Sequence, residues 1–162
     1  VVGALDATAM EELSMQTRLE ELPVSIFGRL TGLASIDMSW CEDLTSLPEG
    51  LFSGLTSLTS INMSNCMRLT SLPEGLFSGL TSLASTDMRY CEGLTSLPEG
   101  LFSGLTSLTS INMTYCYGLT SLPDLSGLTA LKVVNMEDCD NLELPAGLVD
   151  ELKAKGVNVL HE

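Results

Sequence analysis

Five cysteines recur at a regular spacing, which makes them the first candidates for disulfide or metal chemistry. The first three steps of the column are equal and the fourth is slightly shorter: Cys41, Cys66, Cys91, Cys116 and Cys139. If each lies on its own turn of a repeating structure, neighbouring thiols stand about 4.8 Å apart along one line. A line does not supply the four converging ligands of zinc, and side chains pointing the same way from adjacent parallel strands rarely meet disulfide geometry. We therefore expect buried, reduced thiols that hydrogen-bond weakly to the backbone, with no metal and no cofactor.

A second column carries carboxylate and amide side chains, whose oxygens are ligands that Ca²⁺ prefers. Its members are Asp37, Asn62, Asp87, Asn112, Asn135 and Asn158. An explanation without a cation is stronger, because an Asn between two Asp residues keeps like charges apart and neighbouring Asn amides hydrogen-bond along a sheet. We expect this column to form an amide ladder at the exposed centre of successive strands.

Catalytic chemistry has little support. The one histidine, His161, is the penultimate residue, and the many Ser and Thr residues recur at repeat positions where turns and strands explain them. The chain contains no phosphate-binding loop, no HExxH and no GxSxG motif. We predict that it is not an enzyme.

Length and charge bound the class of protein. The 162 residues, 44% of them hydrophobic, suffice for a single domain with an aliphatic core. Seven basic against 21 acidic residues give a net charge of -14, which disfavours nucleic acid and anionic membranes as partners. The sequence begins at Val1 without a methionine, so we expect a processed product or a piece of a longer protein.

The dominant feature is an internal repeat. The segment LTSLPEGLFSGLTSL occurs three times unchanged and at a constant period, beginning at Leu44, Leu69 and Leu94. In the next unit SLPDLSGL replaces SLPEGLFSGL, so that unit is shorter. Self-similarity at such a period indicates a solenoid, in which each unit buries its apolar face only against its neighbours.

Within a unit the pattern is Leu58-x-x-Ile61-x-Met63-x-x-Cys66-x-x-Leu69-x-x-Leu72-Pro73. This resembles the leucine-rich repeat family, whose consensus is L-x-x-L-x-L-x-x-(N or C)-x-L. The resemblance covers residues 19 to 160, with Met in a slot usually held by Leu and one extra residue after the Cys. Cysteine followed by L-x-x-L-P looks like the repeats of plant intracellular immune receptors, whereas PEGLFSGL is similar to extracellular "typical" repeats. The family implies an α/β solenoid with a curved parallel sheet on its concave side and short 3₁₀ or irregular arcs on its convex side.

Local patterns predict the elements. Alternation over residues 60–64 predicts a strand of about five residues in each unit, and the closely spaced Pro and Gly of the return leg exclude a long helix. Helical spacing of apolar residues predicts a helix over 146–155 and then a strand over 157–160. Near the start we expect a weak helix over 6–12 and a strand over 13–15. The expected organisation is one domain over 1–162, with an N-terminal cap (1–18), five repeat units (19–141) and a C-terminal helix-strand unit (142–162).

Differences between near-identical units point to the binding residues. The units beginning at Leu44 and Leu94 match at 21 of 25 positions, and all four differences lie at the end of the predicted strand or just beyond it. On the family's fold the variable slots form two rows on the concave sheet and its rim: Trp40, Asn65, Tyr90, Tyr115 and Asp138, and beside them Ser39, Ser64, Arg89, Thr114 and Glu137. Tyr, Trp and Arg supply much of the affinity at interfaces. Unselected drift at unconstrained positions is the alternative.

The sequence therefore predicts a non-enzymatic module that binds a protein or peptide. Its expected partner-binding residues are Trp40, Asn65, Arg89, Tyr90, Tyr115, Tyr117, Glu137 and Asp138. Arg89 should engage a carboxylate or an aromatic face. One alternative is the recognition segment of a larger receptor or enzyme, and a remote one is ice or crystal-surface binding through the serine column that begins at Ser35.

Localisation and assembly follow less directly. Free buried thiols fit a reducing compartment, and the N-glycosylation motifs at Asn62 and Asn112 would cover the sheet if they were used, so an intracellular protein is favoured over a secreted one. We expect a monomer or weak end-to-end association through an exposed end strand.

Overall fold

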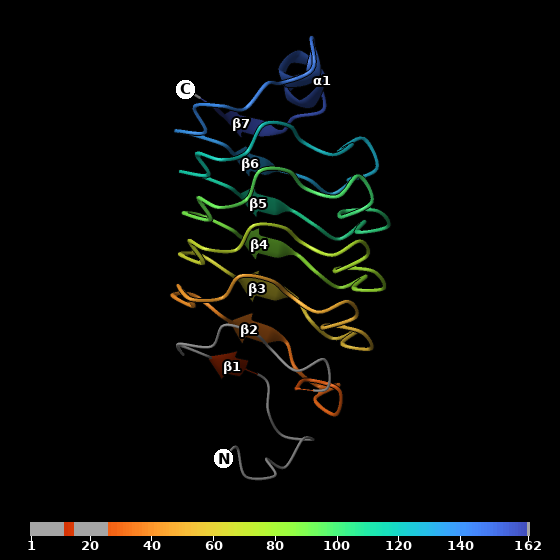
Figure 1. The fold of residues 1–162 in the computed structure, drawn as a ribbon. Coiled ribbons are helices and arrows are strands. Elements are labelled where there is room, and N and C mark those ends of the chain that lie inside the picture. Colours follow the sequence, from red (N-terminus) through yellow and green to blue (C-terminus); the bar gives the residue numbers. More distant parts are fainter. Residues whose placement is uncertain (1–11, 15–25, 162) are drawn as a thin grey trace.

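A computed structural model describes residues 12–14 and 26–161 of the chain. Seven short strands form one parallel sheet in chain order, and each strand begins a new turn of the solenoid (Figure 1). They are β1 (Glu12–Ser14), β2 (Ser35–Asp37), β3 (Ser60–Asn62), β4 (Ser85–Asp87), β5 (Ser110–Asn112), β6 (Val133–Asn135) and β7 (Asn158–Leu160), with one helix, α1 (Leu148–Ala154), before β7. From β2 to β5 each strand pairs with the equivalent residues of the next unit, as Ser60 does with Ser85, so the predicted repeat solenoid is confirmed.

The strands are shorter than the alternation predicts. In β2 to β6 the central residue is buried and its two neighbours are half-buried. The parallel hydrogen bonds nevertheless continue beyond the strand, because the Met63 amide donates to the Asp87 carbonyl (2.7 Å) and the Asn65 amide to the Arg89 carbonyl (2.8 Å). Each turn is thus tied to the next over a longer stretch than the strand itself.

The return arcs are strings of separate turns. In the unit that begins at Leu44, the amides of Leu51, Ser53 and Leu55 each donate to the carbonyl three positions earlier, at 3.3, 2.9 and 3.2 Å. These bonds are not consecutive, so no 3₁₀ helix forms in the described part of the arcs, and they are irregular. The arcs before the shortened unit bury one Phe each, and the rings of Phe27, Phe52, Phe77 and Phe102 stack with centroid distances of 5.8, 6.3 and 6.3 Å.

At the C-terminal end a helix replaces the irregular return arc. The shortened unit lacks the Phe of the other arcs, and α1 follows one turn later. The helix is shorter at both ends than the predicted range of 146–155. It closes at Gly156 (φ 82°), where the Gly156 amide donates to the Lys153 carbonyl (2.9 Å) and the Val157 amide to the Leu152 carbonyl (3.0 Å). β7 then pairs with β6, and it begins one position later than predicted.

At the N-terminal end, β1 lies one position before the predicted strand. Residues 6–11 of the predicted first helix, and most of the expected cap over 1–18, lie outside the described residues. The division into cap, five units and C-terminal unit stays a prediction.

The cysteine column lies in the core, as predicted. The thiols of Cys66, Cys91, Cys116 and Cys139 donate to the Met38, Met63, Met88 and Met113 carbonyls of the preceding turn, at 3.4, 3.2, 3.1 and 3.0 Å. Among the described residues no disulfide joins these cysteines, and Cys139 differs from the prediction in being only half-buried. Burial raises the pKa of the Cys91 thiol to about 12, because the thiolate would lose its hydration.

One core position departs from the apolar pattern. Thr86 lies at the centre of β4, where β3 and β5 carry Ile61 and Ile111, and it is 2% exposed. Its hydroxyl oxygen has no hydrogen-bond partner among the described residues. A buried hydroxyl without a partner costs free energy of folding.

Buried thiols should resist alkylation in the native protein. Iodoacetamide at mildly alkaline pH is expected to modify Cys139 alone, because the other four thiols are shielded and Cys91 keeps its proton. In urea without reductant all five should react, as read by mass spectrometry. Native labelling of Cys91 as fast as a free thiol, or any disulfide-linked peptide, would contradict this packing.

Restoring the apolar column should stabilise the fold. Thr86→Ile removes the unpaired hydroxyl and is expected to raise the free energy of unfolding by about 1–2 kcal/mol. The matched control, Ile61→Thr at the equivalent position, should lower it by a similar amount. Urea unfolding followed by circular dichroism measures both, and a destabilised Thr86→Ile protein would show that the slot does not accept the larger side chain.

Candidate protein-binding rim

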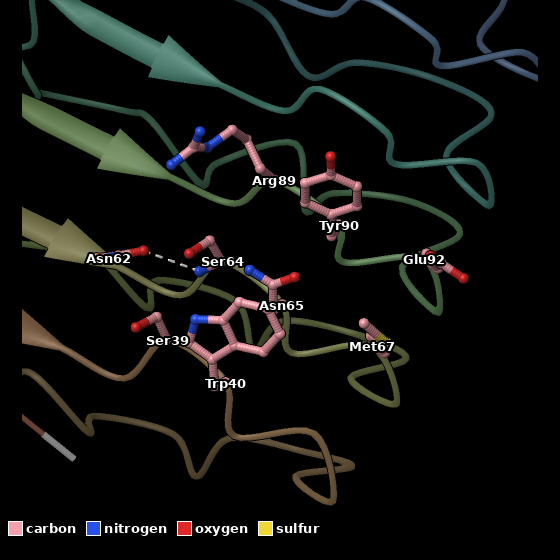
Figure 2. Close-up of a pocket in the computed structure, with 9 residues that line it drawn as sticks. All are labelled: Ser39, Trp40, Asn62, Ser64, Asn65, Met67, Arg89, Tyr90 and Glu92. Carbon is pink, nitrogen blue, oxygen red and sulfur yellow. Dashed lines mark hydrogen bonds between the residues drawn. The ribbon is translucent and has the colours of Figure 1, made fainter. Parts of the chain in front are cut away.

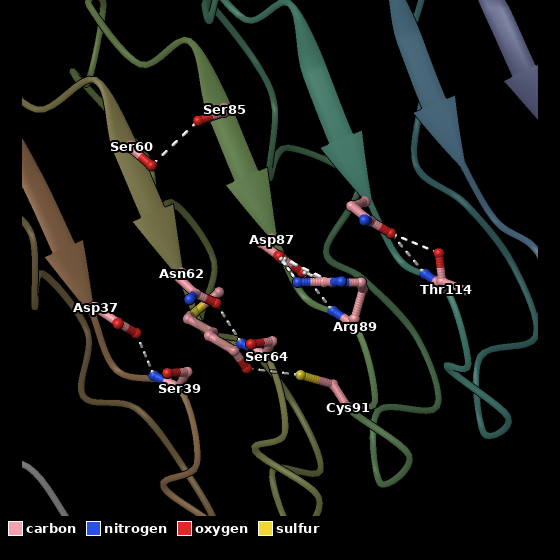
Figure 3. A network of polar contacts seen from close by, with 12 residues as sticks. Asp37, Ser39, Ser60, Asn62, Ser64, Ser85, Asp87, Arg89, Cys91 and Thr114 are labelled. Carbon is pink, nitrogen blue, oxygen red and sulfur yellow. Dashed lines mark hydrogen bonds and ion pairs between the residues drawn. The ribbon is translucent and has the colours of Figure 1, made fainter. Parts of the chain in front are cut away.

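A polar turn ends each strand. In β2 to β6 the Asp or Asn after the buried strand centre accepts, through a side-chain oxygen, a hydrogen bond from the amide two positions later. Figure 3 shows this contact for Asp37, Asn62 and Asp87. For Asn62 the acceptor distance to the Ser64 amide is 3.0 Å, and for Asp87 the distance to the Arg89 amide is 3.1 Å. The predicted amide ladder is therefore wrong: these side chains lie at the ends of the strands and bond within their own turn. They are committed to the backbone, and not arranged around a cation.

The third residue after this Asp or Asn takes a left-handed conformation. The residues with positive φ are Trp40 (64°), Asn65 (62°), Tyr90 (58°), Tyr115 (62°) and Asp138 (57°). Their backbone is held by the adjacent turn, since the Trp40 amide donates to the Ser64 carbonyl (2.9 Å) and the Tyr90 amide to the Thr114 carbonyl (3.0 Å). This is the first predicted row, and we call it the rim row. It lies just past the sheet, not on it.

The rim row combines an unfavourable backbone with large side chains. The left-handed region brings Cβ close to the carbonyl oxygen and costs roughly 1–2 kcal/mol for most residues, whereas Asn and Gly adopt it readily. Asn65 and Asp138 suit the position, but Trp40, Tyr90 and Tyr115 do not. Strain of this kind concentrates at functional sites.

Three tyrosines form one aromatic cluster at the rim. The rings of Tyr90 and Tyr115 stack with centroids 4.6 Å apart and an interplanar angle of 16°, which confirms the predicted side-by-side placement of this row. Tyr117 adds a third ring, 6.0 Å from Tyr115 and tilted by 56°. Trp40 and Tyr117 are the large apolar side chains most exposed among the described residues, at 54% and 37%.

A notch interrupts the row between Trp40 and Tyr90. Asn65 is the short residue between the two rings, and Figure 2 shows its amide above the indole and below the phenol. The hollow measures about 680 Å³ and is also lined by Met67, Arg89 and Glu92. An aromatic wall on each side and polar groups at the edges suit the insertion of one partner side chain.

The second predicted row is not a surface. Ser39, Ser64 and Thr114 are buried at 5%, 4% and 7% exposure, because their amides close the polar turns. Glu137 is half-buried, and its carboxylate accepts a hydrogen bond from the Asn135 side chain (3.0 Å). Only Arg89 of this row is exposed.

Arg89 binds a carboxylate of its own chain. Its Nε donates to both Asp87 oxygens (3.0 Å each) and its terminal nitrogen lies 2.8 Å from Oδ2. Asp87 accordingly raises the pKa of the guanidinium. Arg68 is likewise 3.4 Å from Asp43 of the preceding turn. Contact of Arg89 with a carboxylate or an aromatic face of a partner stays a prediction, and a partner's carboxylate would have to compete with Asp87.

Sequence reasoning missed two lining residues. Met67 and Glu92 occupy the slot immediately after the cysteine, where the other units carry Glu42, Tyr117 and Asp140. The residue at this slot varies among the units, and that variation could have identified Met67 and Glu92. By contrast, Gly93 and Gly118 vary for a packing reason, because a Cβ would lie 2.8 Å from the Leu69 carbonyl oxygen and 2.5 Å from that of Glu92.

The aromatic cluster lies in a negative electrostatic environment. Asp138 raises the pKa of Tyr115 most strongly, with Tyr90 and Glu137 also contributing. Partial desolvation and then Asp138, Asp140 and Glu92 raise the pKa of Tyr117. Both phenols are therefore neutral at physiological pH, with carboxylates beside them.

Two further features bound the chemistry of the described residues. Across residues 12–14 and 26–161, no three His, Cys, Asp or Glu side chains gather as a metal site would require. No helix in the same part of the chain is long and apolar enough to cross a membrane.

Comparison with known proteins decides the family. The family described as "BspA type Leucine rich repeat region" matches residues 3–125 in six copies. The chain is a leucine-rich repeat protein of this type. Its family is a common protein-binding module. The chain has no match among curated proteins.

Solved structures agree on the leucine-rich repeat fold. A chain of the Drosophila Toll–Spätzle complex superposes with a TM-score of 0.68 and 28% identity over 89% of this chain and 19% of its own length. The leucine-rich repeat domain of the type III effector XopL gives 0.63 and 25% over 95% and 61%. Human trophoblast glycoprotein gives 0.57 and 21% over 94% and 69%, which shows the fold alone. The chain thus spans about a fifth of the Toll-complex chain.

Relief of backbone strain should make a rim variant more stable. Trp40→Asn places at φ 64° the residue type that the next unit has at φ 62°, so we expect the free energy of unfolding to rise by about 0.5–1 kcal/mol. The reverse change, Asn65→Trp, should lower it by a similar amount. Urea unfolding tests both. A loss above about 1 kcal/mol for Trp40→Asn would mean that the indole is held by structural contacts.

Proposed function

We propose that this leucine-rich repeat protein is a non-enzymatic module that binds a protein or peptide through its rim. The observation that carries the proposal is the presence of Trp40, Tyr90 and Tyr115 in left-handed backbone, where Asn or Gly would fold at lower cost. Trp40 is exposed and the stacked Tyr90 and Tyr115 are half-buried, so folding covers these rings only in part. Binding accounts for them better, since an aromatic side chain gains further free energy when a partner covers its exposed area.

The geometry supports a small interface with a few strong contacts. Trp40 and the stacked pair of Tyr90 and Tyr115 flank the notch above Asn65, so one extended segment lying along the row would meet all of them. Since the turns are joined by parallel hydrogen bonds, the rings keep their spacing without a partner. Preorganisation of this kind reduces the entropic cost of binding.

The comparisons motivate two neighbouring proposals. Since this chain corresponds to a small part of the Toll-complex chain, it also suits the recognition segment of a larger receptor or enzyme. The buried thiols of Cys66, Cys91 and Cys116, which form no disulfide, favour an intracellular setting, where conditions are reducing. Ice or crystal-surface binding is disfavoured, because the rim presents protruding rings and a notch instead of a flat lattice.

Paired variants test the rim. Tyr90→Asn with Tyr115→Asn removes the stacked rings and also the left-handed strain, so the free energy of unfolding should change by less than about 1 kcal/mol. Wild type and variant are each used to capture partners from native lysate, and a protein retained by wild type is then titrated by calorimetry. We expect the double variant to bind it at least about 30-fold more weakly, which corresponds to about 2 kcal/mol.

The control lies on the opposite side of the turn. Ser53→Ala with Ser103→Ala changes two exposed arc positions and should leave the affinity within about twofold. If the arc variant loses the partner while the tyrosine variant retains wild-type affinity, the binding surface is the arc side and the rim proposal is wrong.

A further inference from the structure

We infer that the segment bound by the rim is basic and presents an arginine side chain to the cluster of Tyr90, Tyr115 and Tyr117. The inference rests on the proposed function of the rim and identifies the chemistry of its partner. Three observations support it. The rim segments are acidic, their two arginines form ion pairs within the protein, and the remaining carboxylates lie beside the rings.

The rim segments are strongly acidic. They comprise residues 37–43, 62–68, 87–93, 112–118 and 135–141, and they hold eight carboxylates: Asp37, Glu42, Asp43, Asp87, Glu92, Glu137, Asp138 and Asp140. Against these stand two guanidinium groups, Arg68 and Arg89. Charge complementarity with a partner therefore favours a cationic segment.

Both guanidinium groups are already paired within the protein. Arg89 binds Asp87 through several contacts, the shortest 2.8 Å, and Arg68 lies 3.4 Å from Asp43. Ion pairs among the described residues use none of the other six rim carboxylates. An acidic partner would have to compete with Asp87 for Arg89, whereas a basic partner meets unpaired negative charge.

The unpaired carboxylates gather where the rings are. Asp138 and Glu137 act on the phenol of Tyr115, and Asp138, Asp140 and Glu92 act on that of Tyr117. The three rings lie together there, because Tyr90 stacks on Tyr115 and Tyr117 is tilted against it, and the exposed Tyr117 offers a ring face to solvent. A guanidinium lying over such a face gains cation–π attraction while its hydrogens reach a neighbouring carboxylate.

The site therefore combines two requirements that arginine meets together. Its planar group stacks on an aromatic ring and donates along its edge, whereas a neutral side chain of the same shape would leave the carboxylates unpaired. The Trp40 end of the row differs, because its indole is 54% exposed and Asp43 of the same segment is paired with Arg68, so Trp40 serves as a hydrophobic anchor. Polarity along the row would then set the direction in which the segment binds.

A pair of probes and a pair of variants test the inference. The probes are a fluorescein-labelled peptide of alternating glycine and arginine, with three arginines, and the same peptide with citrulline, which keeps the shape and removes the charge. Fluorescence anisotropy with the full chain should show binding of the arginine peptide and at least about fivefold weaker binding of the citrulline peptide. Equal affinity for both peptides would overturn the inference.

The variants distinguish binding at the rim carboxylates from general attraction to the acidic protein. Glu92→Gln with Asp138→Asn removes two rim charges and places Asn, a residue suited to left-handed backbone, at position 138. Affinity for the arginine peptide should fall at least about fivefold. The control, Glu49→Gln with Glu99→Gln, removes the same charge from exposed arc positions and should change affinity less than about twofold. An equal loss in both variants would mean general attraction to an acidic protein and would overturn the inference.

The same variants distinguish this inference from the function on which it rests. If the Tyr90→Asn, Tyr115→Asn protein loses a captured partner but the Glu92→Gln, Asp138→Asn protein binds that partner normally, the rim is a binding site and the basic chemistry is wrong. If neither variant weakens the captured partner, both proposals fail. Parallel loss of the partner and of the arginine peptide in both rim variants supports both.

Discussion

The backbone of each turn is completed by the turn beside it. A strand this short cannot satisfy its own amides and carbonyls, so the ladder between successive turns carries the architecture, and it extends past each strand to the residue with positive φ. This requirement places the same left-handed residue at the same position in successive units. It also explains why the deletion in the shortened unit lies in an arc, since the arcs close on themselves through short local turns. The position of the rim row therefore follows from the hydrogen bonds between successive turns.

The repeat period accounts for most of what could be predicted. Columns of Leu, Phe and Cys mark the core directly, because a residue that recurs at the same place in each unit packs against its own copies. The left-handed backbone could not be predicted in the same way. Asn65 and Asp138 are typical of it, but Trp40 and the two tyrosines are not, so the column as a whole carries no such signal. The repeat spacing identifies the rim residues, but their left-handed backbone is seen only in the structure.

Local hydrogen bonding explains where the prediction failed. The Asp and Asn side chains were expected to bond across strands, but the amide two positions later is nearer and would otherwise lack an acceptor. Arg89, which is predicted to contact a partner, is also paired with Asp87, two positions before it. Neither of these local contacts follows from one column taken alone, because both run along the chain. These ion pairs change the charge that the rim presents. Because Arg68 and Arg89 are paired with Asp43 and Asp87, the charge left around the aromatic rings is negative.

The three identical arcs have a consequence for how such a protein can change over generations. Since LTSLPEGLFSGLTSL recurs without a difference, the coding stretches for successive units offer matching points at which recombination can remove or insert one whole unit. The new junction joins the same residues that met before, so the stacked Phe rings and thiol hydrogen bonds are reproduced in the longer or shorter chain. Each event instead adds or deletes one member of the rim row. The rim row can thus be lengthened or shortened in whole steps, without a compensating change in the core.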